Sequence, residues 1–182
     1  MPDNVAEACV EFNHHLLTLR LRGTVRRMST PDSTATPQDP RFESRVRDSF
    51  ALQTVMATLG AALSRVAPGE VDIALPFRAD LAQQHGFVHA GILATILDSA
   101  CGYAAFTLMP ADAAVLSIEF KINLLSPAAG ERFIARGRVL RSGRTISVCQ
   151  AYGFAISGGA EKLIATMQGT MMCVRDNPAL RG

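Results

Sequence analysis

The segment from His89 to Phe106, HAGILATILDSACGYAAF, is almost entirely apolar or small and carries one acid, Asp98, near its centre. It predicts a helix over residues 90–108. A helix that is apolar on nearly all faces must be covered on nearly all faces. The segment is about long enough to cross a membrane, but no Lys or Arg flanks it and a charge at the bilayer centre is expensive. We therefore predict a buried helix of a soluble protein, outside the membrane.

Runs with the alternation of β-strands lie on both sides of this helix. Before it, AALSRVA and EVDIALPF flank a Pro68-Gly69 turn and predict a hairpin. After it, four strand-like runs follow with turns at Ser142-Gly143 and Gly158-Gly159: AVLSIEFKINLL, ERFIARGRVLRS, RTISVCQAYGFAIS and KLIATMQGTMMCV. Such closely spaced runs indicate an antiparallel meander. In the first run, strict alternation predicts that Ser117 and Phe120 face opposite sides of the strand.

The elements together predict the α+β class. One amphipathic helix is expected between Pro40 and Gly60, with the glycine ending it. A curved antiparallel sheet of five to six strands, wrapped around a long central helix, would cover that helix on most of its faces.

The N-terminal part differs in composition from the rest of the chain. The basic stretch LRLRGTVRRM is followed by STPDSTATPQDP, which has the composition of a loop. We predict a poorly ordered extension over residues 1–40, with a short amphipathic helix possible at residues 10–21. It is either a genuine arm or the product of a translation start assigned upstream of Met28. One domain is predicted over residues 41–176, followed by a C-terminal tail over residues 177–182.

Composition excludes several classes of protein. The net charge is only +2, and no dense basic run lies outside the N-terminal part, so nothing predicts nucleic-acid binding. The four cysteines are far apart and form no CxxC pair, and they combine with the four histidines into no metal-ligand spacing. We expect reduced thiols, a cytoplasmic location and no bound metal.

Asp98 is the residue that points to chemistry. An ionised carboxylate in a core segment must be paired, shifted in pKa or in contact with a cavity. One interpretation is structural, with Asp98 hydrogen-bonded to a backbone amide or to Ser117. The other is catalytic, and the residues ahead of the helix favour it. The first amides of a helix, here those of Ala90 and Gly91, lack internal partners and suit a developing oxyanion. His89 either takes part in this site or simply caps the helix.

The spacing along the helix predicts an oligomer. Ala90 and Asp98 are eight residues apart, about 12 Å along an α-helix. A base and an oxyanion donor must both lie roughly 3 Å from one reacting centre. Within one subunit they cannot cooperate, so a site that uses both requires two antiparallel copies of the helix in a homodimer, with two sites at each interface.

The segment QQHGFVHAGILATILDSACGYAA, with VLSIEFKINLLSPA and RSGR, resembles the hotdog-fold acyl-CoA thioesterases of the phenylacetate-degradation (PaaI-type) group, over about residues 50–174. The resemblance implies a hotdog fold and hydrolysis of acyl-CoA to a free acid and CoA, in a homodimer or homotetramer. Asp98 would act as general base or nucleophile. The amide of Ala90, with Gly91 and His89 beside it, would stabilise the oxyanion. Gln83 would orient substrate or water, and Ser117 would hold water.

The sequence departs from the family pattern at two places. The usual His-Gly-Gly is His-Ala-Gly here, and Ala90 keeps its N–H if it is already helical. The loop between Asp98 and Ser117 differs in length from close relatives by about one residue. No cofactor is implied beyond the coenzyme A of the substrate. Its phosphates would be met by Arg138, Arg141 and Arg144 at the Ser142-Gly143 turn, and Phe106, Met109 and Leu125 either line an acyl pocket or belong to the core.

Two other functions stay open. A hotdog dehydratase or hydratase acting on acyl thioesters would pair a histidine with an acid, as His89 and Asp98 superficially allow. A non-catalytic acyl-CoA sensor would normally carry a DNA-binding helix-turn-helix, which residues 1–40 do not resemble. Release of free thiol separates these hypotheses from hydrolysis.

Overall fold

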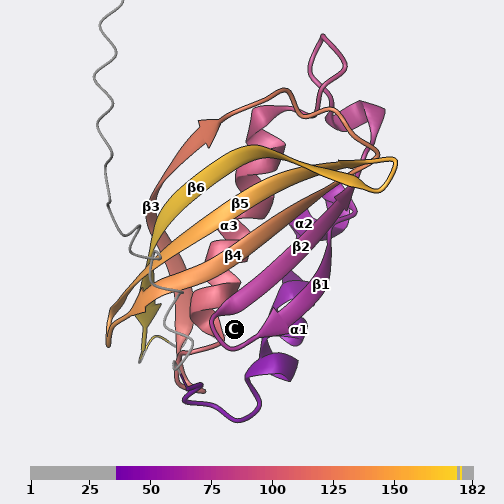
Figure 1. Cartoon of the computed structure of the whole chain (residues 1–182). Coiled ribbons are helices and arrows are strands. Elements are labelled where there is room, and N and C mark those ends of the chain that lie inside the picture. Colours follow the sequence, from indigo (N-terminus) through magenta and orange to yellow (C-terminus); the bar gives the residue numbers. More distant parts are fainter. Residues whose placement is uncertain (1–35, 176, 178–182) are drawn as a thin grey trace, which may run out of the picture.

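The computed structural model describes residues 36–175 and residue 177. Three α-helices, one short 3-10 helix and six strands form the domain (Figure 1). In chain order these are α1 (Phe42–Leu52), α2 (Thr54–Leu59), β1 (Ala62–Ala67), β2 (Glu70–Pro76), η1 (Ala79–Leu81), α3 (Ala90–Phe106), β3 (Ala114–Leu124), β4 (Arg132–Ser142), β5 (Ile146–Ser157) and β6 (Ala160–Val174). The central helix is two residues shorter than predicted. No helix in this described part is long and apolar enough to cross a membrane.

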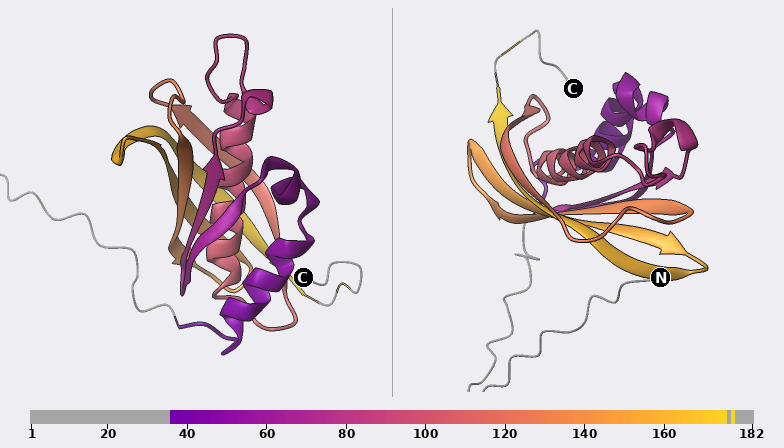
Figure 2. Two further views of the ribbon diagram at one scale, coloured as in Figure 1. Left: turned by 90° about the vertical axis from the view of Figure 1, so that its right-hand side faces the viewer. Right: turned by 90° about the horizontal axis from the view of Figure 1, so that it is seen from above.

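The six strands form one antiparallel sheet that curves around α3 (Figure 2). This arrangement confirms the predicted fold class and the hairpin of β1 and β2. The prediction of a simple meander is wrong for β3, because the strand order is β1-β2-β4-β5-β6-β3. Since α3 crosses the concave face between β2 and β3, the chain re-enters the sheet at the opposite edge, where β3 pairs with β6.

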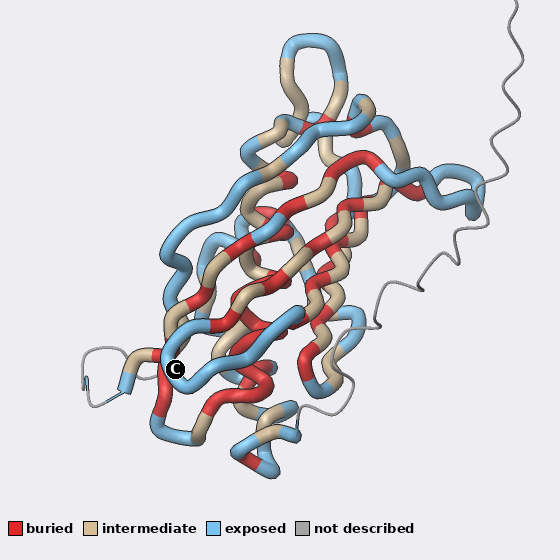
Figure 3. Tube along the Cα trace, turned by 60° about the vertical axis from the view of Figure 1, so that its left-hand side comes forward, coloured by how far each residue is buried: buried red, intermediate tan, exposed pale blue. Residues whose placement is uncertain are grey.

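The core lies between α3 and the concave face of the sheet. Buried and less buried residues alternate along the strands (Figure 3). On β4, Phe133 and Ala135 are fully buried, and Gly137 lies where α3 comes closest. A Cβ at residue 137 would lie 2.3 Å from the carbonyl oxygen of Ala100, so only glycine allows this approach of helix and sheet.

The predicted helix between Pro40 and Gly60 is two helices, with the break at Gln53 (φ −76°, ψ 91°). In one continuous helix, Leu59 would project about 140° away from Val46, given 3.6 residues per turn. The break lets both side chains be buried, at 4% and 0% exposure. Gly60, in the left-handed region at φ 71°, ends α2 as predicted.

The C-terminal end of α3 is held by Arg45. Its guanidinium donates hydrogen bonds to the carbonyl oxygens of Phe106 (2.9 Å), Met109 (2.8 Å) and Pro110. It also lies 3.6 Å from the carboxylate of Asp39. Asp39 thus contacts the domain although the predicted boundary assigns it to the extension. The predicted helix at residues 10–21 lies outside the described residues.

Candidate active site

Asp98 lies near the middle of α3 and is partly buried. The hydroxyl of Ser117 donates a hydrogen bond to its Oδ1 at 2.7 Å. Burial raises the pKa of Asp98 above its ordinary value, and the hydrogen bond from Ser117 offsets part of that rise. The carboxyl lines a cavity of about 390 Å³, whose walls contain no Lys or Arg: Gln53, Val55, Gly91, Ala94, Thr95, Asp98, Ser99 and Phe120. A carboxylate without a cation, facing a cavity, is available to accept a proton.

A β-bulge in β3 puts Ser117 and Phe120 on the same side of the strand. Ser117 pairs with Met171 and Glu119 pairs with Thr170, so Ile118 is an extra residue in the ladder. One inserted residue reverses the alternation that follows it. Ser117 bonds to Asp98 and Phe120 lines the cavity beside it, so both face α3, and the prediction that they face opposite sides is wrong.

The N-terminal end of α3 presents one free amide. His89 is the N-cap, and its Nδ1 accepts a hydrogen bond from the N–H of Gly91 at 2.9 Å. The imidazole acceptor requires an unprotonated Nδ1. Within the described part of the chain, the N–H of Ala90 donates to no acceptor. Of the two predicted oxyanion donors, Ala90 therefore has an available N–H, whereas the N–H of Gly91 is engaged by the cap.

Gln83 begins the loop that precedes α3. The loop projects beyond the sheet at the top of Figure 1. It is closed by a hydrogen bond from the N–H of Gln83 to the carbonyl oxygen of Phe87 at 2.8 Å, and the side-chain Oε1 of Gln83 accepts from the N–H of His85. Gln83, His89 and Ala90 share a second cavity of about 610 Å³, with Gln84, Phe87, Val88, Leu93, Leu124, Leu125, Ser126, Pro127 and Ala128 as its other walls.

The structure thus groups the predicted residues into two sets at different points along α3. Asp98, with Ser117 hydrogen-bonded to it, lies at one cavity, and Gln83, His89 and Ala90 lie at the other. Gly91 lines the Asp98 cavity. Eight residues of α3, about 12 Å, separate the acid from the free amide. The two sets do not meet within one chain.

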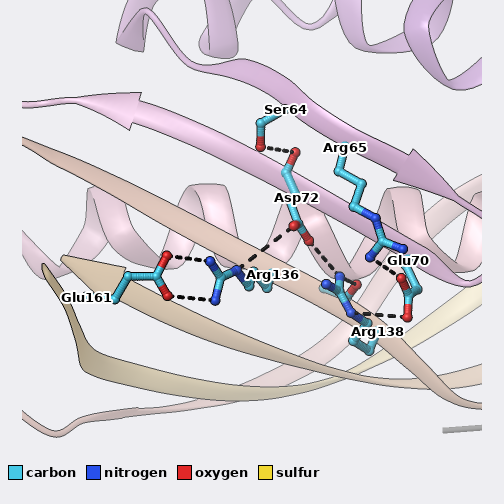
Figure 4. A network of polar contacts seen from close by, with 8 residues as sticks. Ser64, Arg65, Glu70, Asp72, Arg136, Arg138 and Glu161 are labelled. Atoms are coloured by element: carbon cyan, nitrogen blue, oxygen red, sulfur yellow. Dashed lines mark hydrogen bonds and ion pairs between the residues drawn. The ribbon is translucent and has the colours of Figure 1, made fainter. Parts of the chain in front are cut away.

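The three arginines predicted to bind phosphates lie apart from these cavities. Arg138 donates to Asp72 at 2.6 Å and lies 3.5 Å from Glu70, within an ion-pair network across β1, β2, β4 and β6 (Figure 4). Its neighbour Gly137 faces α3, so Arg138 points to the outer face of the sheet. Arg141 and Arg144 are exposed near the β4–β5 turn and form no ion pair with the residues described. The charge of Arg138 is already neutralised, which leaves only these two for a phosphate.

The apolar residues predicted either for an acyl pocket or for the core also fall into two groups. Phe106 and Met109 are 1% and 3% exposed at the far end of α3, so the structure places them in the core. Leu125 lines the larger cavity. Gln53, Val55 and Phe120, which line the Asp98 cavity, were not predicted. Only a tertiary contact between α1–α2 and α3 identifies the first two.

The remaining thiols and acids form no second site in the described part of the chain. No group of three or more His, Cys, Asp or Glu could hold a metal ion there. Cys101, Cys149 and Cys173 are free and buried. Burial raises the pKa of Cys149 to about 12 and that of Cys101 above its ordinary value, so both are unreactive thiols.

A curved antiparallel sheet around a central helix, with an acid at mid-helix beside a cavity, defines a hotdog-fold protein. The family model described as "Thioesterase superfamily" matches residues 85–160. A thioesterase family protein from Silicibacter pomeroyi is 54% identical over 74% of this chain and 98% of its own, with a TM-score of 0.73. The chain therefore belongs to the thioesterase superfamily.

More distant relatives share the fold or part of the sequence. The E. coli PaaI protein from the phenylacetic acid degradation operon shares the fold, with a TM-score of 0.66 at 18% identity over 74% of this chain and 94% of its own. A protein of Halobacterium salinarum named as a candidate esterase is 32% identical over 101 residues, 53% of this chain. This chain spans 66% of the length of that relative and 58% of a similar one from Saccharolobus solfataricus.

Proposed function

We propose that the protein hydrolyses acyl-CoA thioesters to a free acid and coenzyme A, in a homodimer whose two sites each combine residues of both subunits. The proposal rests on the environment of Asp98. Its carboxyl accepts a hydrogen bond from Ser117 and faces a cavity whose walls contain no cation to neutralise it. Membership of the thioesterase superfamily supports thioester hydrolysis as the class of reaction.

Asp98 acts on the thioester in one of two ways. As a general base, its carboxylate takes a proton from water while the water oxygen attacks the carbonyl carbon. The tetrahedral intermediate then expels the thiolate of coenzyme A, which takes the proton from the Asp98 carboxyl. As a nucleophile, the carboxylate attacks first, the thiolate leaves, and water hydrolyses the resulting anhydride. Transfer of labelled oxygen in a single turnover distinguishes the two routes.

The oxyanion of either intermediate needs a hydrogen-bond donor that one chain cannot supply. The free N–H of Ala90 lies about 12 Å along α3 from Asp98. In an antiparallel pair of α3 helices related by a twofold axis, the partner's Ala90 approaches Asp98. The partner's Gln83 enters the same site, because it shares the cavity of Ala90.

The surface of β3 supports this pairing. β3 is an edge strand, and edge strands carry unpaired N–H and C=O groups that bind a further strand. Its apolar side chains remain exposed, with Leu116 at 44%, Ile118 at 49% and Phe120 at 44%. Since Phe120 also lines the Asp98 cavity, a second copy bound along β3 brings its residues to that cavity.

The experiment compares thiol release from acyl-CoA by the wild-type protein and by Asp98→Asn. The amide keeps the size of the side chain and can still accept from Ser117. We expect the rate to fall by about 10²–10⁴-fold, the contribution typical of a positioned general base, with the oligomeric state unchanged. Unchanged release in the variant would refute the mechanism. Substrate binding without thiol release by the wild type would favour the non-catalytic sensor.

A further inference from the structure

One wall of the Asp98 cavity comes from the break between α1 and α2. Gln53 lies at this break and lines the cavity, and Ser99, the residue after Asp98, lines it as well. The Ser99 hydroxyl donates to Oε1 of Gln53 at 3.4 Å. This contact joins the N-terminal helices to α3 beside the acid.

The contacts between α1 and α3 form a seam that extends beyond the Gln53–Ser99 contact. One helical turn away, the Ser49 hydroxyl lies 3.5 Å from the Tyr103 hydroxyl, and the rings of Phe50 and Tyr103 are 5.7 Å apart. Neither Ser49 nor Tyr103 lines the cavity. Both polar contacts are at the long limit for hydrogen bonds and are therefore weak. The Gln53–Ser99 contact thus closes the cavity on the side of this seam.

We propose that Gln53 is a specificity-determining residue, which limits the length of the acyl group that the Asp98 cavity accepts. The inference rests on the proposed function. A thioester carbonyl at Asp98 has two branches, the acyl group and the long polar arm of coenzyme A. In the proposed dimer, the larger cavity of the partner subunit, of about 610 Å³, lies beside the same carbonyl, because Ala90 is one of its walls.

The cavity of about 390 Å³ takes the acyl group in this proposal, because it lies at Asp98 itself and has Val55, Ala94 and Phe120 as apolar walls beside polar ones. The substrates are therefore acyl groups that end at the Gln53–Ser99 contact, and longer fatty acyl chains are excluded. In an apolar pocket, one methylene too many changes the rate about 10–200-fold.

The test measures kcat/KM for thiol release across straight-chain acyl-CoAs from acetyl to palmitoyl. We expect the wild-type values to fall sharply beyond one chain length. Gln53→Ala removes the wall and opens the seam toward Tyr103. It should raise the ratio of long-chain to short-chain kcat/KM by on the order of tenfold or more. Gln53→Leu keeps the volume without the amide, so its length limit should match that of the wild type.

Two further variants keep the test decisive. Gln168→Ala makes the same truncation at an exposed site on β6 and should leave the profile unchanged. Val55→Phe adds volume from a residue that is 44% exposed, so the fold tolerates it, and it should shorten the limit. If Gln53→Ala and Val55→Phe both keep the wild-type limit, or if the wild type has no limit, the inference is wrong. The proposed function would still stand in that case, because it depends on Asp98→Asn.

Discussion

Replacing Ala90 with proline would remove one N–H group and little else. Ala90 is the first residue of α3, where proline is favoured, and His89 before it is extended (φ −61°, ψ 139°), as a residue before proline must be. No described acceptor loses a hydrogen bond, because the Ala90 N–H donates to none. We expect the free energy of unfolding of Ala90→Pro to lie within about 0.5 kcal/mol of the wild-type value.

The effect on catalysis should be large despite the unchanged fold. Removing one oxyanion donor typically lowers kcat by about 10²–10³-fold, or roughly 2.7–4 kcal/mol of transition-state stabilisation. Thiol release by purified Ala90→Pro should therefore be close to that of Asp98→Asn. The match would place the amide and the acid in the same reaction.

Mixing the two variants tests whether they come from different subunits. A heterodimer has one site with both wild-type groups and one site that lacks both. Purification by both tags keeps only heterodimers, so about half of the wild-type activity should return. The assay is thiol release from co-expressed, differently tagged subunits purified by both tags in turn.

Two results would refute the reasoning. Mixed subunits with no more activity than the separate variants would show that the acid and the amide do not share a site across the interface. Full activity of Ala90→Pro would show that its N–H is not the oxyanion donor. Unmixed variants, carried through the same purification, provide the baseline.

The remaining predictions concern pH and stability. Ser117→Ala removes the donor that stabilises the Asp98 carboxylate, so only burial shifts its pKa and that pKa rises further. Since hydrolysis needs the carboxylate, the acid limb of kcat/KM against pH should move to higher pH than in the wild type; an unmoved limb would contradict the assignment. Arg45→Met leaves Asp39, which is 3% exposed, without its buried cation. It should lower the free energy of unfolding in urea by about 3–5 kcal/mol, whereas Arg47→Met, at an exposed ion pair on the same helix, should cost less than about 1 kcal/mol.

The sequence by itself determined the parts of this protein that local patterns encode. The apolar segment from His89 to Phe106 predicted a covered helix, and the Pro68-Gly69 turn between alternating runs predicted a hairpin, and the structure has both. The acid inside that helix identified the candidate site, since burying a carboxylate without a function or a partner is costly. The helical rise alone predicted that a site using both Asp98 and Ala90 needs two chains.

Only the tertiary structure decided which residues meet at the acid. The periodicity of the sequence indicates how buried each position is, but it does not indicate which strands pair. In the structure, α3 connects β2 to β3 at the opposite edge of the sheet. The bulge at Ile118 puts Ser117 and Phe120 on the same side of β3, although alternation predicts opposite sides. The break at Gln53 brings a distant amide to the same cavity, and the carboxylates of β2 neutralise Arg138. Each of these contacts joins segments that are far apart in the chain. Its free energy therefore depends on the whole fold, and no local sequence pattern reveals it.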